Sequence, residues 1–161
     1  MNDPRQKTAS FIGILGAFLV VVMIANVTGN EEIETYRGLA WRGAVIPATC
    51  LAVFLFSLTG LPPFAGFIGK FFLFAAVLKQ GGAFVLLAVV AIINSVISLY
   101  YYAKVVKTMF LDFPEPTDAA VSVAPNNFTL LIPLTVLTIV LGIYFYPLAQ
   151  YTSQSLRFFV K

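Results

Sequence analysis

Lys70 is the residue whose type and position most clearly suggest chemistry in this sequence. It lies in an apolar run from about Ala44 to Leu78, and between Arg42 and Lys79 the chain holds no other basic residue and no acid. At mid-membrane a charged lysine costs roughly 2.5–3.5 kcal/mol on insertion scales, because desolvation disfavours the charged form of an amine. An amine so placed can bind and release a proton, so the sequence predicts a proton-transfer role for Lys70. The structural alternative is a fixed ion pair, whose acid would have to come from another chain.

Just before Lys70 the sequence carries strong signals for an interrupted helix. Gly60, Pro62 and Pro63 fall close together, and proline removes a backbone donor and clashes with the preceding turn. A continuous helix over the 35 residues of the apolar run would reach about 52 Å, whereas the hydrocarbon core of a bilayer is about 30 Å thick. We therefore expect two half-helices, near residues 44–58 and 64–78, with Lys70 close to the bilayer centre. Broken helices beside ionisable groups at this depth are typical of transporters.

A second set of polar residues lies in the next apolar stretch. Asn94, Ser98 and Tyr101 are spaced i, i+4 and i+7 and share one face of a helix, which Ser95 widens. Two interpretations stay open, because such a stripe either forms hydrogen bonds with neighbouring helices or lines a hydrated path. Lys104 follows near the end of this stretch. Its long stem can reach the membrane surface, and the alternative is a site of proton uptake or release.

Composition excludes several other classes of protein. The chain has 161 residues, of which 60% are hydrophobic and 11% charged, against about 25% charged residues in soluble domains. It contains no histidine and a single cysteine, Cys50, so the usual zinc, haem and iron–sulfur sites cannot be built from this chain alone. We therefore expect no metal site and no cofactor-binding site. We also expect no nucleic-acid binding, because no basic stripe follows any face of the chain.

The elements that position these residues are four predicted spans of an all-α integral membrane fold. The spans cover about residues 8–27, 44–78, 83–104 and 128–147. The second span is expected to be broken at Gly60–Pro63. We expect residues 1–161 to form a single membrane domain. Gly13 and Gly16 are small residues that allow another helix to approach the first span closely. The connecting segment at 30–42 is expected to form a helix on the membrane surface, capped by Asn30.

Three stretches of the sequence resemble one family of membrane proteins. Ser57–Phe71, which includes the Gly-Leu-Pro-Pro break and Lys70, resembles the broken twelfth helix of subunit N of respiratory complex I, called NADH dehydrogenase subunit 2 in mitochondria. Leu99–Val106 resembles the end of the thirteenth helix of that subunit, and Glu32–Leu39 resembles the loop before the broken helix. The three motifs agree in order and spacing, so the resemblance is specific.

The resemblance implies a proton-pumping, antiporter-like subunit of about fourteen helices, in which Lys70 matches a lysine of proton transfer. Gly69-Lys70-Phe71 favours subunit N over the sister subunit M, which has glutamate at the lysine position. The chain would match the last four helices, about a third of the family's length. Either a partner chain supplies the preceding helices, as in a split gene, or the sequence is a fragment. Enzymatic activity, the coupling of quinone reduction to proton pumping, would belong to the whole NADH:quinone oxidoreductase and not to this chain.

The same resemblance implies cofactors, partners and a location. FMN, iron–sulfur clusters and quinone are expected in other subunits, and none in this chain. The expected partners are the chain that supplies the missing helices, M-like and K-like membrane subunits, and lipid. A bacterial inner membrane is the first expectation, with the mitochondrial inner membrane and the thylakoid membrane as alternatives. Two other functions stay open: a piece of a stand-alone cation/proton antiporter, and a structural membrane anchor.

Overall fold

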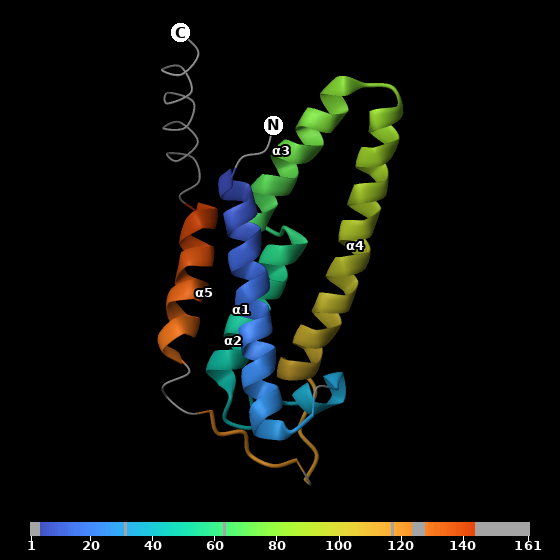
Figure 1. Ribbon diagram of the computed structural model, residues 1–161. Helices are drawn as coiled ribbons and strands as arrows, with labels where there is room; N and C mark the ends of the chain where they lie inside the picture. Colours follow the sequence, from blue (N-terminus) through green and yellow to red (C-terminus); the bar gives the residue numbers. More distant parts are fainter. Residues whose placement is uncertain (1–3, 31, 63, 117, 124–127, 144–161) are drawn as a thin grey trace.

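The computed structural model describes residues 4–30, 32–62, 64–116, 118–123 and 128–143, and every regular element within them is helical (Figure 1). These elements are α1 (Pro4–Thr28), the 3-10 helix η1 (Ile33–Tyr36), α2 (Val45–Thr59), α3 (Ala65–Gln80), α4 (Ala83–Phe110) and α5 (Phe128–Ile143). Among the described residues, two stretches are long and apolar enough to cross a membrane by themselves: Phe11–Thr28 in α1 and Phe84–Phe110 in α4. The prediction of a helical fold is confirmed.

The α-helices form an elongated bundle. α2 packs against α1, α4 and α5, while α3 packs against α1, α4 and α5 further along the bundle. In Figure 1, α2 lies in the lower half of the molecule and α3 in the upper half, beside the longer α1 and α4. The two shorter helices therefore follow one another along the bundle, and their junction lies partway along it.

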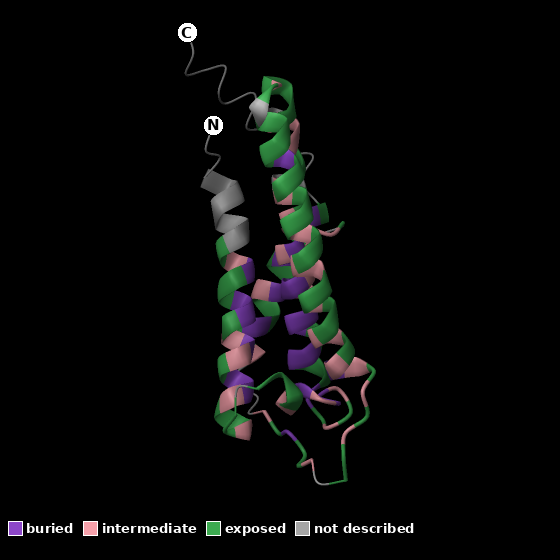
Figure 2. Cartoon of the chain, turned by 90° about the vertical axis from the view of Figure 1, so that its right-hand side faces the viewer, coloured by how far each residue is buried: buried purple, intermediate pink, exposed green. Residues whose placement is uncertain are grey.

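Buried side chains concentrate in the half of the bundle that lies next to η1 (Figure 2). Val20 and Ile24 of α1, Phe54 of α2, Met109 of α4 and Leu131 of α5 are all fully buried. Apolar side chains dominate this core, as expected if burial of apolar area drives the helices together. The outer face of α4 is different, because its large apolar side chains are exposed along most of its length.

Two glycines of α1 allow α2 to approach it closely. Gly16 lies against the ring of Phe54, and a Cβ atom at this position would overlap three of the ring carbons. Gly13 lies against Leu58, where an added Cβ would be 3.4 Å from the nearest side-chain carbon. The prediction that these small residues accept a neighbouring helix is confirmed.

The connecting segment before α2 differs from its prediction. Instead of a surface helix capped by Asn30 it forms the single short turn of η1, and Tyr36 and Leu39 are buried. Backbone donors of this segment reach across to the end of α4: Gly38 N–H donates to Thr108 O at 2.9 Å and Ala40 N–H donates to Met109 O at 3.1 Å. The Trp41 indole N–H donates to Phe110 O at 3.0 Å. The expected helix was wrong because some backbone donors of the segment bind the end of α4, while others, such as Leu39 N–H to Tyr36 O, close only short turns.

These contacts also explain why α4 is longer than predicted. The last carbonyls of a helix have no partner within it and need one from elsewhere. Here the segment at 38–41 supplies those partners, so the helix continues past the predicted end near residue 104 to Phe110. α1 also exceeds its predicted span of 8–27, since it runs from Pro4 to Thr28. Pro63 and the last part of the predicted fourth span, residues 144–147, lie outside the described residues.

Candidate functional site

The junction between α2 and α3 begins with a glycine-capped helix end. Gly60 has φ 80° and ψ 42°, a left-handed conformation that glycine adopts without strain. Its N–H donates to Ser57 O and the Leu61 N–H donates to Phe56 O, both at 3.1 Å. This pair of hydrogen bonds is the Schellman arrangement, which closes a helix at its C-terminus. α2 therefore ends through Gly60, and Pro62 follows in the non-helical segment.

The first turn of α3 packs directly onto the last turn of α2. A Cβ atom on Gly66 would overlap the carbonyl oxygen of Ser57 and would lie 2.9 Å from its carbonyl carbon. The rings of Phe56 and Phe64 stack across the junction, with 6.4 Å between their centroids. Only a residue without a side chain fits at Gly66, so the spacing of the two helices depends on it.

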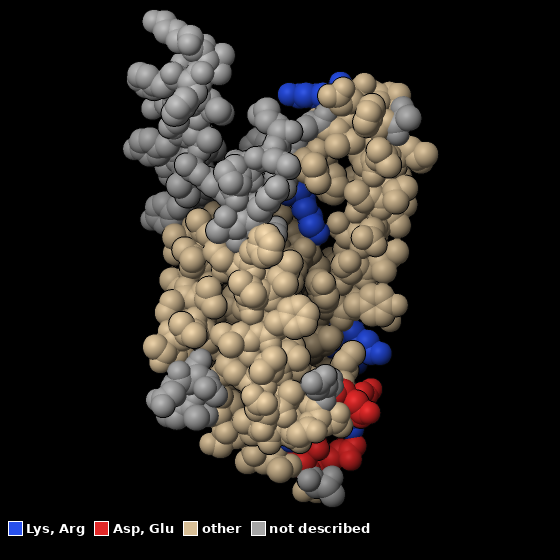
Figure 3. Space-filling model, in the orientation of Figure 1, with Lys and Arg blue, Asp and Glu red and all other residues tan. Residues whose placement is uncertain are grey.

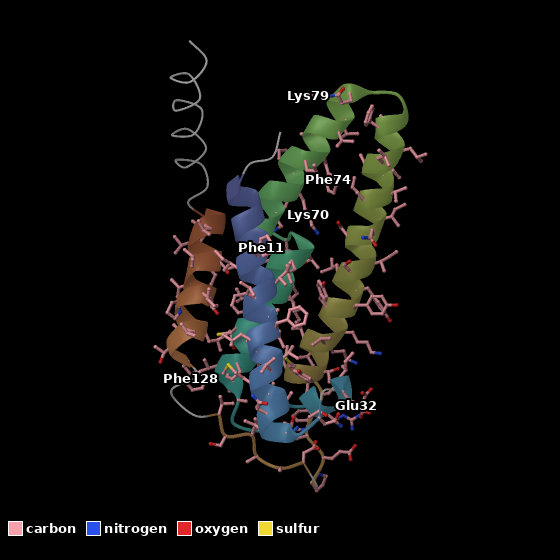
Figure 4. All side chains as sticks on the ribbon, in the orientation of Figure 1. Phe11, Glu32, Lys70, Phe74, Lys79 and Phe128 are labelled. Carbon is pink, nitrogen blue, oxygen red and sulfur yellow. The ribbon has the colours of Figure 1, made fainter. Side chains whose placement is uncertain are left out.

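Lys70 binds the free end of α2. Its Nζ donates a hydrogen bond to the carbonyl oxygen of Thr59 at 2.9 Å, and Thr59 is the last residue of that helix. Figure 4 shows the lysine on α3, with its side chain in the space between α3 and α4 near the top of α2. The C-terminus of a helix carries partial negative charge, which stabilises a nearby cation by typically 0.3–1 kcal/mol. The ammonium form of Lys70 is therefore held by a carbonyl and a helix dipole.

The second partner of Lys70 is a hydroxyl of α4. The distance from Lys70 Nζ to Ser95 Oγ is 3.4 Å, and that hydroxyl donates in turn to Ala91 O at 3.0 Å. Ser95 is therefore an acceptor toward the amine, in a longer and weaker contact than that of Thr59. It lies near the middle of the 28-residue helix α4, so the amine lies about halfway along the longest helix of the bundle.

No carboxylate accompanies the amine in the part of the chain that the structure describes. All the acids of the sequence fall outside the five α-helices, and Figure 3 shows the described ones gathered at the end of the molecule near η1. The described ion pairs, Arg37 with Glu115 and Lys107 with Asp112, lie at that end too. The contacts of Lys70 thus come from neutral oxygen atoms, and release of its proton would break no ion pair within the described chain.

The predicted stripe on α4 lies beside this site but does not touch the amine. Ser98 Oγ donates back to Asn94 O at 2.9 Å. Asn94, Tyr101 and Lys104 are exposed. The hydrogen bonds of the Lys70 amine within the described chain go to Thr59 and Ser95. The structure therefore brings Lys70, Gly60 and the helix end together and places the stripe on an adjacent side of α4.

Three contributors to the site are hard to recognise in the sequence. The Thr59 carbonyl is a backbone group, so its only signal is the following glycine, which predicts a helix end. Ser95 appears in the sequence as a flanking member of the polar stripe, whereas the structure makes it the residue of α4 that contacts the amine. Gly66 carried no separate prediction, since glycine is common where membrane helices pack closely.

Replacing Ser95 with alanine is expected to have a small effect. The variant loses one long hydrogen bond, and an ordinary hydrogen bond contributes about 0.5–1.5 kcal/mol. We expect a loss of a few-fold at most in any proton transfer through Lys70, with the Thr59 contact retained. The measurement is the rate of proton movement in membranes that carry the variant. Thr49→Ala is the control, because the Thr49 hydroxyl donates back to Val45 O within α2 and lies outside the site. An effect of Thr49→Ala as large as that of Ser95→Ala would contradict this assignment.

A family model and individual known proteins both match this chain, and the two comparisons agree with each other. Residues 11–98 match the family described as NADH:quinone oxidoreductase/Mrp antiporter, transmembrane. NADH-quinone oxidoreductase subunit N of Anaeromyxobacter sp. (strain Fw109-5) is 44% identical over 151 residues, which are 90% of this chain and 29% of the relative. Subunit N 2 of the same enzyme from Sorangium cellulosum is 46% identical over 146 residues, 88% of this chain and 28% of the relative. NAD(P)H-quinone oxidoreductase subunit 2 of Gloeobacter violaceus is 41% identical over 150 residues, which are 89% of this chain and 28% of the relative. The chain thus spans less than a third of the length of these relatives.

Proposed function

The chain belongs to the NADH:quinone oxidoreductase/Mrp antiporter family of transmembrane proteins, and on this basis we propose that it is the C-terminal part of a proton-translocating subunit N of NADH-quinone oxidoreductase. It is an integral membrane protein. In the proposed role it couples quinone reduction, carried out elsewhere in the enzyme, to proton movement through Lys70. The names of the relatives favour this function over a stand-alone cation/proton antiporter.

The observation that carries the proposal is the environment of the Lys70 amine. It is held by the Thr59 carbonyl at the C-terminal end of α2 and by one hydroxyl, with no carboxylate partner among the described residues. An ammonium in a strong ion pair gives up its proton reluctantly, because opposite charge favours the charged form. Neutral oxygen partners leave both the charged and the neutral amine accessible, which is the property that a proton relay requires.

We further propose that α2 and α3 are the two halves of one membrane span. α2 has 15 residues and α3 has 16, so each reaches only about 22–24 Å, less than the roughly 30 Å of a hydrocarbon core. Arranged one after the other they would cross it together. The proposed spans are then α1, the α2–α3 pair, α4 and a fourth span that begins with the 16 residues of α5. Gly60, Pro62 and Pro63 form the proposed break. The backbone N–H and C=O groups at this break would form hydrogen bonds with other protein groups, because lipid tails offer none.

The proposed route for protons leaves Lys70 along α4. Asn94, Ser98 and Tyr101 form a polar side of that helix, and internal water along it would connect the amine with Lys104 nearer the membrane surface. Ser95 would hold the amine at the start of this route, since it is the α4 residue that the amine contacts. Lys104 would take up or release the proton at the other end.

The proposal places redox chemistry outside this chain. FMN, iron–sulfur clusters and quinone would be bound by other subunits. The chain would neighbour M-like and K-like membrane subunits and the helices that supply the rest of subunit N, in a bacterial inner membrane. The mitochondrial inner membrane and the thylakoid membrane are the other locations in which a subunit of this type would function.

Co-purification tests the assignment. An affinity-tagged chain, extracted from its native membranes with a mild detergent, is expected to bring down membrane subunits of the same enzyme together with its NADH-oxidising hydrophilic subunits. A matched preparation tagged on an unrelated membrane protein is the control. Recovery of antiporter subunits without any hydrophilic redox subunit would contradict the proposed function.

A further inference from the structure

Gly60 lies against the aliphatic stem of Lys70. A Cβ atom at Gly60 would be only 2.9 Å from Lys70 Cδ. The same atom would be 3.3 Å from Gly66 O and 3.5 Å from Phe67 Cα. Non-bonded carbon atoms come to rest at about 3.5–4.0 Å, so the separation from Lys70 is too short for a real side chain. The space beside Gly60 is therefore already filled, by the lysine stem and by the backbone of α3.

Backbone conformation alone does not account for a glycine at this position. The left-handed φ of 80° is one that asparagine adopts more readily than other residues with a side chain. Gly29 offers a comparison within the same chain, because its φ is 72° and a Cβ atom there would meet nothing within 4 Å. The two glycines share a left-handed φ. Of the two, Gly60 is the one that also makes room for a neighbouring side chain.

The position of the stem is linked to the hydrogen bonds of the Lys70 amine. Cδ is two bonds from Nζ, and Nζ donates to Thr59 O at 2.9 Å, which is close to the optimum for such a bond. Moving Cδ from 2.9 Å to an ordinary carbon–carbon separation shifts it by about 0.6 Å or more. The contact with Ser95 Oγ, at 3.4 Å, is already longer than an ordinary hydrogen bond. A displaced stem therefore takes the amine out of its present geometry.

We propose that Gly60 is a positioning residue for Lys70. Thr59 and Gly60 are consecutive and together form a seat for the lysine, in which Thr59 offers its carbonyl oxygen and Gly60 leaves open the space that the stem occupies. A residue with a Cβ atom at position 60 displaces the stem and draws the amine off the Thr59 carbonyl. Because the lysine stem is flexible, it can move without unfolding the bundle. The consequence for proton movement rests on the proposed function of Lys70, whereas the geometric claim does not.

The contact between the amine and Thr59 can be measured directly in the assembled enzyme. Lysine Nζ is labelled with ¹⁵N and the threonine carbonyl with ¹³C, and magic-angle spinning NMR detects the dipolar coupling that disappears in Lys70→Ala. We expect Gly60→Ala to remove most of this coupling, which falls with the cube of the distance. Gly29→Ala is the matched control, because it places alanine at a similar φ in open space, and it should leave the coupling unchanged. A coupling in Gly60→Ala as strong as in the unsubstituted enzyme would overturn the proposal.

A second substitution separates displacement of the stem from backbone strain. Gly60→Asn keeps the added Cβ atom but tolerates the left-handed conformation, so we expect it to lose the coupling as well. Recovery of the coupling in Gly60→Asn would show that strain was responsible, and would overturn the proposal. Proton pumping by the same variants reports separately on the proposed function. Pumping that persists after the coupling is lost would contradict the role of Lys70 and not the position assigned to its stem.

Discussion

Replacing Lys70 with alanine is expected to remove most of the quinone-coupled proton pumping while leaving the enzyme assembled. A positioned proton-transfer group typically contributes roughly 10²–10⁴-fold to the step it serves, and no other basic residue and no acid lies between Arg42 and Lys79 to replace it. The truncation also leaves the Thr59 carbonyl without its amine partner, at a cost of about 1–3 kcal/mol if water cannot reach it. The measurement is NADH-driven acidification of inverted membrane vesicles, normalised to intact enzyme on a native gel.

Two further variants separate proton transfer from structure. Lys70→Arg keeps a positive charge near the Thr59 carbonyl, but a guanidinium does not release its proton in a protein, so assembly should be retained and pumping lost. Lys79→Ala removes an exposed lysine in the last turn of the same helix and should leave pumping unchanged. Full pumping by Lys70→Arg would contradict the proton-transfer role. Loss of assembly together with activity in Lys70→Ala would point to a structural anchor instead.

Replacing Gly66 with alanine is expected to be the most damaging single change to the junction. Alanine normally favours a helix over glycine by about 1 kcal/mol. At this position, however, the new Cβ would overlap the backbone oxygen of Ser57, and a backbone group at the end of a packed helix cannot rotate away as a side chain can. Overpacking of this kind costs typically 1–3 kcal/mol and sometimes more. We expect reduced yield, a lower unfolding midpoint in detergent and a displaced Lys70 amine.

Gly13→Ala is the matched control for this change. Gly13 is also a helical glycine at a contact with another helix, but its added Cβ would lie 3.4 Å from a flexible Leu58 methyl group. It should therefore be tolerated, with a change in the unfolding midpoint far smaller than that of Gly66→Ala. Equal tolerance of the two substitutions would show that the close approach of α3 to Ser57 does not govern this junction.

The sequence predicts the parts of the site that depend on local chemistry. An isolated lysine in an apolar run and the Gly-Pro signal before it are local features, and in the structure α2 ends at Thr59 and α3 begins at Ala65. The partners of Lys70 are different in kind. Thr59 O is a backbone atom on the preceding helix, and Ser95 is 25 residues further along the chain, so neither contact can be read from spacing within one helix.

The segment before α2 shows the limit of local patterns most clearly. Asn30 followed by acids is a good helix-start signal, yet only η1 forms there. Gly38, Ala40 and Trp41 donate instead to the last carbonyls of α4, about seventy residues away. These non-local bonds satisfy carbonyl groups that have no partner within α4, and they outweigh the local preference.

The protonation state of Lys70 during turnover is the most direct test of the account. In enzyme labelled with ¹⁵N-lysine, the Nζ signal of Lys70 is identified by its disappearance in Lys70→Ala, and magic-angle spinning NMR distinguishes an ammonium from a neutral amine by its chemical shift. We predict that the signal divides between the two forms when NADH and quinone are supplied and returns to one form when turnover stops. A Lys70 signal that stays at the ammonium position throughout turnover would contradict the central claim that this amine passes protons.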